Sequence, residues 1–314
     1  MTLDTSSVGY SVLTMLLVVV VGYIAQKLNF FPGDTRKRYS DLIIRIGQPF
    51  LIVGSITSIE YSSEKLKDGF FVLFLGLATI ALAGVIAFFA TLWMKNKDER
   101  KIAEFGSMFS NCGFMGIPVL RALFGDIGAF WAAFYLIALN LCQWTYGIYI
   151  WARGRDDIKL NLKSILLNYG TVPSTIGILL FVTRVPIPDP VLDSINYVGS
   201  LCTPISMLVI GALIATIEPK RLVTNVKIYI FCIIKLFVVP FIVITVCHFV
   251  GLSNEMMLFI AVICSLPSPS NVAMFGEKFD ILPDFAAHAV GMGTILSTLT
   301  VPIMVRYAEF LLSL

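Results

Sequence analysis

The stretch from 110 to 118 lies in the middle of an apolar run, and it contains residues that an ordinary membrane helix avoids. Its sequence, SNCGFMGIP, combines two glycines with an asparagine and a proline. Pro118 has no N–H, and its ring clashes with the carbonyl four residues earlier in a helix. We therefore predict a helix that breaks near the bilayer centre, where irregular backbone must be buried by protein or line a cavity.

A second stretch of this kind, SLPSPSN at 265–271, occurs far downstream. Two interrupted apolar segments at corresponding positions of two halves indicate the binding site of a transporter. The pair of stretches is the main sequence evidence for function.

The composition places the rest of the chain in a membrane. The chain has 314 residues, of which 57% are hydrophobic and 14% charged, whereas a soluble domain has about 25% charged residues. The net charge of +3 gives no indication of a nucleic-acid partner. The N-terminus lacks the basic region of a signal peptide, so the first apolar run is expected to remain as a span.

Catalytic and cofactor chemistry is not predicted. No nucleophile–base arrangement, HExxH, aspartate pair or phosphate-binding loop is found in the sequence, so we expect no enzyme, no cofactor and no metal site. The cysteines all fall in apolar runs without CxxC spacing, and we interpret them as small apolar residues. They are Cys112, Cys142, Cys202, Cys232, Cys247 and Cys264.

We predict an all-α membrane protein, because a span needs about 20 predominantly apolar residues and ten such segments occur. They are 7–28, 37–59, 69–94, 102–123, 128–151, 162–184, 191–217, 224–250, 255–276 and 285–312.

The two halves resemble each other. The second span contains Gln48-Pro49, the seventh contains Thr203-Pro204, and the broken stretches lie in the fourth and ninth. We predict two five-helix repeats, 1–152 and 161–314, joined by a cytoplasmic linker at 153–160. Because five is odd, the second repeat must be inverted, as in many secondary transporters.

The candidate site residues come mainly from the broken stretches and from the fifth span. An amide in hydrocarbon must be hydrogen-bonded; it either ties off backbone groups at a break or also contacts substrate, and we favour the second. Asn140 and Gln143 share a helix face and either join helices or line a cavity. The predicted substrate-binding residues are Asn111, Cys112, Gly113, Asn140, Gln143, Gln48, Ser270 and Asn271.

Other residues have predicted structural or electrostatic roles. Gly116, Pro118, Pro267 and Pro269 are expected to form the crossover without binding substrate. Arg45 and Lys235 are basic residues within spans, so each is a functional candidate. The alternatives are that Arg45 extends to the membrane surface and that Lys235 pairs with a carboxylate or carbonyl. His288 and Asp284 are expected at the membrane interface.

At these residues the chain resembles the auxin efflux carrier family, which includes the plant PIN carriers and bacterial organic-acid permeases. The fourth span carries the clearest resemblance: Asn111-x-x-x-Met115-Gly116-Ile117-Pro118-x-Leu120-Arg121-Ala122-x-Phe124-Gly125-Asp126. Asn140 with Trp144, Leu266-Pro267, the segment 275–284 and Pro49 also fit. The short linker resembles that of bacterial members.

The resemblance implies a fold like that of sodium/proton antiporters and bile-acid symporters. A transport domain containing two crossed broken helices would move against a scaffold domain, in an elevator mechanism. It also implies a homodimer, and an organic anion whose carboxylate lies at the crossover beside Asn111.

From these observations we predict a multi-pass cell-membrane transporter of small carboxylates that works by alternating access. Uniport and coupling to protons or sodium both remain open, although neither broken stretch contains an Asp or Glu. A ligand-gated sensor or channel that uses the same pocket is the alternative from another class.

The distribution of Lys and Arg predicts the orientation, because cytoplasmic loops are enriched in both. Basic residues concentrate after odd-numbered spans, at 27–38, 95–101, 153–163 and 220–227. Both termini should therefore face outward. Reporter fusions at Leu314 and within 95–101 test this topology, and a cytoplasmic signal at Leu314 would contradict both it and the inverted repeats.

Overall fold

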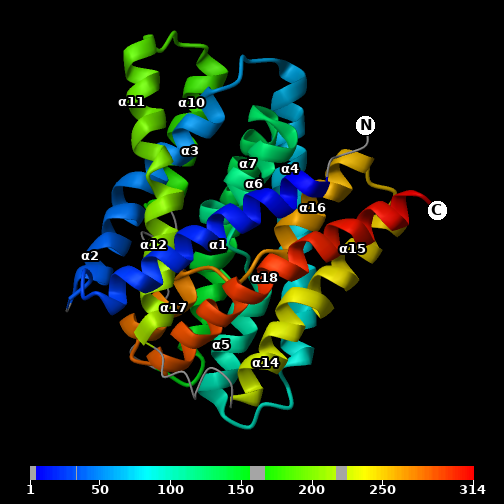
Figure 1. Ribbon diagram of the computed structural model, residues 1–314. Coiled ribbons are helices and arrows are strands. Elements are labelled where there is room, and N and C mark those ends of the chain that lie inside the picture. Colours follow the sequence, from blue (N-terminus) through cyan, green and yellow to red (C-terminus); the bar gives the residue numbers. More distant parts are fainter. Residues whose placement is uncertain (1–4, 33, 156–166, 217–224) are drawn as a thin grey trace.

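The computed structural model describes residues 5–32, 34–155, 167–216 and 225–314, and these residues form helices joined by short connections (Figure 1). The first part of the chain contains α1 (Thr5–Lys27), α2 (Thr35–Leu42), the π-helical turn η1 (Ile43–Gly47), α3 (Gln48–Thr57) and α4 (Ser63–Ala90). It continues with α5 (Lys97–Met108), η2 (Cys112–Gly116), α6 (Ile117–Phe124), α7 (Asp126–Cys142), η3 (Gln143–Gly147) and α8 (Ile148–Ala152).

The second part of the chain contains α10 (Thr171–Thr183), α11 (Asp189–Ser200), α12 (Cys202–Thr216), α14 (Val226–Ile233), η4 (Ile234–Val238) and α15 (Val239–Val250). It ends with α16 (Asn254–Ser265), α17 (Asn271–Lys278) and α18 (Pro283–Leu312). Most of the predicted linker, from residue 156 onward, lies outside the described residues, as does the start of the predicted sixth span.

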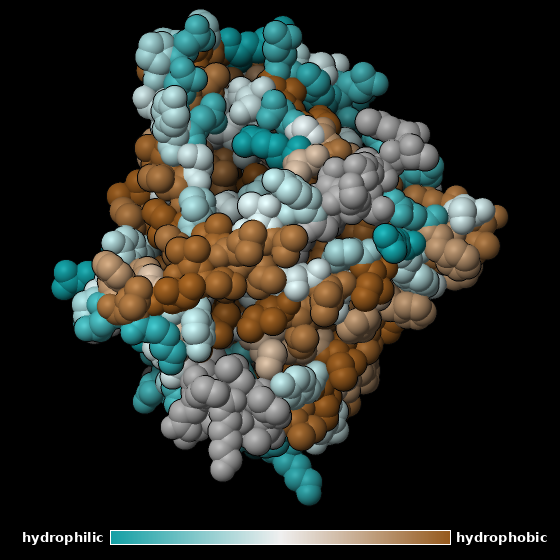
Figure 2. All heavy atoms as spheres, viewed as in Figure 1, coloured by the Kyte–Doolittle hydropathy of each residue, from teal (hydrophilic) through white to brown (hydrophobic). Residues whose placement is uncertain are grey.

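The all-α, membrane-spanning character predicted from the sequence is confirmed. Among the described residues, 5 helical segments are long and apolar enough to cross a membrane: Ser63–Ala90, Asp126–Ala152, Asp189–Thr216, Val226–Val250 and Pro283–Leu312. Hydrophobic residues dominate the middle of the surface, whereas hydrophilic residues gather at the end where α10 and α11 meet (Figure 2). This is the surface expected of a protein whose sides face lipid.

Prolines account for most of the π-helical turns. Pro49, Pro118 and Pro240 each occupy the second position of a helix that directly follows such a turn. A proline removes one N–H and clashes with the carbonyl four residues earlier, and a wider turn accommodates both effects within a continuous segment. The sequence therefore specifies these local widenings through single residues.

The helices pack as two groups. One group, here called the panel, consists of α1–α3 and α10–α12, with α1 packed along α12 and α3 packed against α10 and α11. The other group, here called the core body, consists of α4–α8 and α14–α18 and contains both broken helices. The panel meets the core body where α1 contacts α6, where α1 and α12 contact α18, and where α3 and α10 contact α7.

Glycines allow α1 and α12 to approach backbone to backbone. A Cβ built on Gly211 of α12 would lie 2.0 Å from the Val19 carbonyl oxygen of α1. A Cβ built on Gly22 would lie 2.2 Å from the Leu208 carbonyl oxygen. Small residues allow this close approach in membranes, where helix association depends on van der Waals packing.

Replacement of Gly211 by Ala should force α1 and α12 apart. We expect the free energy of unfolding to fall by about 1–3 kcal/mol, the usual cost of overpacking, with a lower midpoint of thermal unfolding in detergent. Val21→Ile, which adds carbon at a position that is 56% exposed on α1, is the matched control and should leave the midpoint unchanged. Equal midpoints for the two variants would contradict the close packing of these helices.

Candidate functional site at two broken helices

The first break separates α5 from the π-helical turn η2. Helix α5 begins at an N-cap, Asn96, whose side chain accepts hydrogen bonds from the backbone N–H groups of Asp98 and Glu99. It ends at Met108, and the chain is non-helical through Asn111. The Asn111 carbonyl then accepts the N–H groups of Met115 and Gly116, each at 3.1 Å, which starts the next helical turn.

The second break separates α16 from α17 and is bonded to the first. Its backbone is non-helical from Leu266 to Pro269, where two prolines remove N–H donors. The Asn111 N–H donates to the Pro267 carbonyl at 2.9 Å, and the Ser268 hydroxyl donates to the Gly106 carbonyl at 2.8 Å. The breaks thus satisfy each other's free backbone groups, which polar groups at membrane depth require.

Three of the predicted amide side chains, Asn111, Asn140 and Gln143, are buried around this crossover. Asn271 at the start of α17 donates from Nδ2 to the Gln143 Oε1 at 2.8 Å, linking the ninth predicted span to the fifth. Gln143 is 0% exposed, and Asn111 and Asn140 are 2% and 4% exposed. The Asn140 side chain lies directly against the backbone of Gly170, which precedes α10.

Three of these amide groups have a nitrogen without an acceptor. Among the described residues, the Nδ2 atoms of Asn111 and Asn140 and the Nε2 atom of Gln143 are buried and have no hydrogen-bond partner. A buried donor without a partner is unfavourable by about 1–3 kcal/mol. Unpaired donors of this kind favour an acceptor that arrives from outside the protein.

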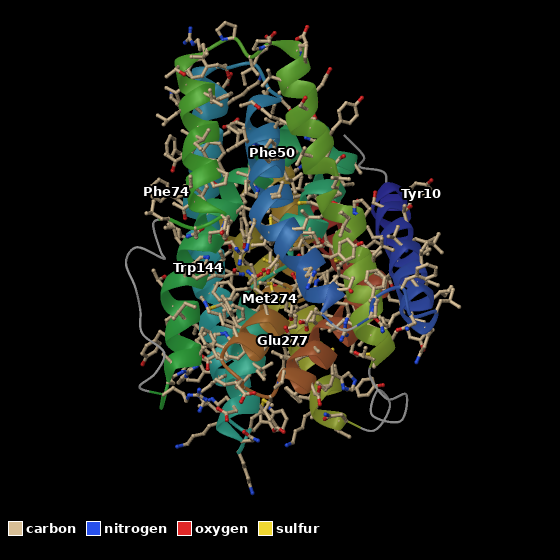
Figure 3. The ribbon with its side chains drawn as sticks, turned by 90° about the vertical axis from the view of Figure 1, so that its left-hand side faces the viewer. Tyr10, Phe50, Phe74, Trp144, Met274 and Glu277 are labelled. Atoms are coloured by element: carbon tan, nitrogen blue, oxygen red, sulfur yellow. The ribbon has the colours of Figure 1, made fainter. Side chains whose placement is uncertain are left out.

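An aromatic and basic group lies next to the amides. The Trp144 ring is centred 5.9 Å from the Phe275 ring, and the Lys278 Nζ lies 5.9 Å from the centre of the Trp144 ring. Figure 3 shows Trp144 of η3 near Met274 and Glu277 of α17. These contacts hold α17 against the fifth span on the side of the crossover that carries Lys278.

The two basic candidates lie in different environments. Lys235 of η4 is 1% exposed, and its Nζ donates to the Ser110 hydroxyl at 2.8 Å, directly beside Asn111. The Arg45 side chain is 60% exposed and pairs with Asp41 at 3.7 Å. Lys235 therefore belongs to the crossover, whereas the contacts of Arg45 fit the alternative in which it extends to the surface.

Other predicted site residues contact protein instead of the amide cluster. Cys112 points its Sγ toward the Ala132 carbonyl at 3.9 Å, and Gly113 packs against Leu136. Gly116 packs against Leu266 of the other break, in agreement with a structural role. Ser270 is half-buried before α17, and Gln48 is half-buried on α3, which belongs to the panel.

Two features near the site were not predicted from sequence. Glu104 of α5 is 0% exposed and accepts hydrogen bonds from Arg153 and Tyr146, which fixes the end of α8 on α5. The sequence feature that could have indicated Glu104 is its position one helical turn before the first break. His288, expected at the interface, is 4% exposed. The described residues contain no group of His, Cys, Asp and Glu suited to hold a metal ion.

Comparison with known proteins gives the family of the chain. Residues 7–305 match the family described as "Membrane transport protein". The chain belongs to this family. The match confirms the resemblance to auxin efflux carriers that the fourth-span residues indicated.

Curated relatives at low identity cover nearly the whole chain. A protein of Methanocaldococcus jannaschii, named as an uncharacterized transporter, is 25% identical over 92% of this chain and 95% of its own length. A protein of Rhizobium meliloti, named "Putative malonate transporter", is 21% identical over 92% of each chain. The chain is therefore a membrane transporter by family, and its crossover is the candidate site.

The Asn271–Gln143 hydrogen bond predicts that alanine substitutions at Asn271 and Asn111 change the stability of the protein to different extents. Asn271→Ala leaves Gln143 buried without a partner at either end of its amide, so the free energy of unfolding should fall by about 1–2 kcal/mol. Asn111→Ala is the matched control and should change stability little, because its Nδ2 has no partner to lose. Denaturant titration in detergent micelles measures both variants, and a larger loss for Asn111→Ala would contradict the observed pairing.

Proposed function

We propose that this membrane transporter carries small carboxylates, and that the substrate carboxylate binds at the crossover of the two broken helices. The observation that carries the proposal is the set of unpaired, buried amide donors on Asn111, Asn140 and Gln143. A carboxylate is an acceptor-only group with about four lone-pair positions. It would supply the acceptors that these donors lack.

The charges at the crossover favour an anion over a cation. The nearest fully buried charge that bonds to the break is the Lys235 ammonium. The buried carboxylate of α5, Glu104, is already paired with Arg153. The two segments that resume after the breaks, η2 and α17, also begin here, and the N-terminal end of a helical segment attracts negative charge.

Alternating access is supported by the division into panel and core body. Both broken helices and Lys235 belong to the core body, so a substrate bound at the crossover would move together with the core body. We propose that the core body slides against the panel in an elevator motion, and that the halves 1–152 and 161–314 are inverted repeats. The glycine contacts that fix α1 on α12 make the panel the stationary unit in this proposal.

The substrate class follows from the site together with one relative. The Rhizobium protein is named for malonate, a dicarboxylate. The Lys278 ammonium lies 5.9 Å from the centre of the Trp144 ring, and Trp144 directly follows Gln143 of the amide cluster. We therefore propose small mono- and dicarboxylates as substrates.

The sequence and the exposed surface together support a proposal for the membrane location and oligomeric state of the protein. The exposed face of α1 carries Tyr10, Leu13, Leu17, Val21 and Ile24, and such a face suits lipid or a second copy of the chain. We propose a homodimer in the cell membrane, with both termini outside, as the distribution of Lys and Arg predicts.

The proposed anion site predicts that two changes at Asn111 weaken substrate binding to different extents. Asn111→Ala removes a hydrogen bond to a charged group, which is worth about 1.5–3 kcal/mol, or roughly one to two decades in affinity. Asn111→Asp should weaken binding further because it places a like charge beside the carboxylate. Substrate affinity is measured by thermal shift with a panel of mono- and dicarboxylates, with and without sodium.

The same pair of variants distinguishes an anion from a coupling cation at this position. A cation bound by the Asn111 amide would be held equally well or better by Asp, while Ala would abolish its binding. An Asp variant that binds carboxylate as tightly as the parent would therefore refute the anion assignment. Saturable counterflow in liposomes separates the transporter from a ligand-gated channel, because a channel does not couple opposite fluxes.

A further inference from the structure

Lys235 is a buried basic residue at the crossover. It lies in η4 of the predicted eighth span, is 1% exposed, and donates from Nζ to the Ser110 hydroxyl at 2.8 Å. Ser110 directly precedes Asn111 and follows the last turn of α5. The ammonium is thus bonded to the non-helical chain of the first break, next to a residue of the proposed carboxylate site.

Among the residues that the structure describes, no acidic side chain pairs with this lysine. The elements packed against η4 are α4, α5, α14, α15, α16 and α18. The titratable group that acts on Lys235 from them is the Cys264 thiol of α16, and no described carboxylate pairs with it. The acidic side chains of α5 have other partners, since Glu104 pairs with Arg153 and Glu99 pairs with Lys227.

A buried charge without a counter-charge is strongly unfavourable, and a bound ion of opposite sign relieves the cost. The C-terminal end of α5 contributes partial negative charge at Ser110, but a helix end supplies only about half a charge. No described carboxylate pairs with Lys235, so a substrate carboxylate at Asn111 would supply the remaining compensation.

We infer that Lys235 is the counter-charge of the transported anion and moves across the membrane with it as part of the core body. This inference rests on the proposed function and adds a charge balance to it. With a monocarboxylate bound, the moving unit has no net charge at the site. With a dicarboxylate bound it carries a single negative charge, and when empty it carries a single positive charge.

This charge balance determines which step of the cycle responds to membrane potential. Lys235 returns in every cycle, so it cannot change the net charge moved per complete turnover. It does change the charge moved in the loaded step, and a charge that crosses the membrane makes its step voltage-dependent. Homo-exchange of a substrate uses only loaded steps and therefore isolates this property.

The test uses the full chain in liposomes with an imposed potassium diffusion potential and labelled pyruvate or malonate, above the second pKa of malonate. For the unaltered protein, pyruvate exchange should be independent of potential, and malonate exchange should depend on it. In Lys235→Gln, pyruvate exchange should become voltage-dependent, and the slope for malonate should become about twofold steeper. Either probe alone is sufficient for the comparison.

Two further variants separate charge from folding. Lys235→Arg keeps the charge, so its exchange should retain the voltage pattern of the parent even where affinity falls. Lys227→Gln removes a charge from the same predicted span, but at an exposed position paired with Glu99, and should leave the pattern unchanged. If Lys235 had a purely structural role, Lys235→Gln would lower the amount of folded protein but would leave the voltage dependence of exchange unchanged.

Different experimental results would refute the counter-charge inference and the proposed function. If pyruvate exchange by the unaltered protein depends on membrane potential, Lys235 is not the counter-charge, although carboxylate transport itself would stand. Equal slopes for the parent and Lys235→Gln would overturn it as well. No saturable exchange of any mono- or dicarboxylate would refute the proposed function, and the counter-charge inference with it.

Discussion

The structure depends on hydrogen bonds between two interrupted helices, each of which supplies partners for backbone groups of the other. Each interruption frees backbone N–H and C=O groups at a depth where water is scarce, and such groups are tolerated only with partners inside the protein. The Asn111 N–H bonded to the Pro267 carbonyl and the Ser268 hydroxyl bonded to the Gly106 carbonyl provide those partners. These two bonds join residues 156 and 162 positions apart in the chain into one structural unit.

The crossover leaves an excess of donors over acceptors. The Asn111 N–H and the Pro267 carbonyl pair with each other, whereas the amide nitrogens of Asn111, Asn140 and Gln143 have no partner among the described residues. Lys235 adds a positive charge bonded to the same segment. A site with spare donors and an uncompensated cation is complementary to an anion, and this complementarity connects the packing to the transport of carboxylates that we propose.

The packing separates the core body, which contains the proposed substrate site, from the panel. Gly22 and Gly211 bring the backbones of α1 and α12 into contact, which stabilises the panel by close packing rather than by polar bonds. The core body instead contains the buried polar bonds, including Glu104 with Arg153 and Asn271 with Gln143. Its internal polar bonds would keep the crossover intact while the core body moves against the panel.

The sequence by itself determined the helical class, the positions of both breaks and the family. Proline and glycine act locally, because a missing N–H or a missing Cβ alters the helix at that residue whatever surrounds it. The fourth-span residues around Asn111 and Pro118 indicated the family that the whole-chain match then confirmed. Amides in an apolar run similarly indicated the candidate site residues before any contact was known.

Only the tertiary structure decided which of those residues meet. Arg45 and Lys235 are both basic residues within predicted spans, yet one is exposed beside Asp41 and the other is buried against Ser110. The sequence left a functional role open for both, because burial depends on which helices pack around a position. The Asn271–Gln143 bond and the burial of Glu104 likewise arise from contacts between distant segments, which local composition does not encode.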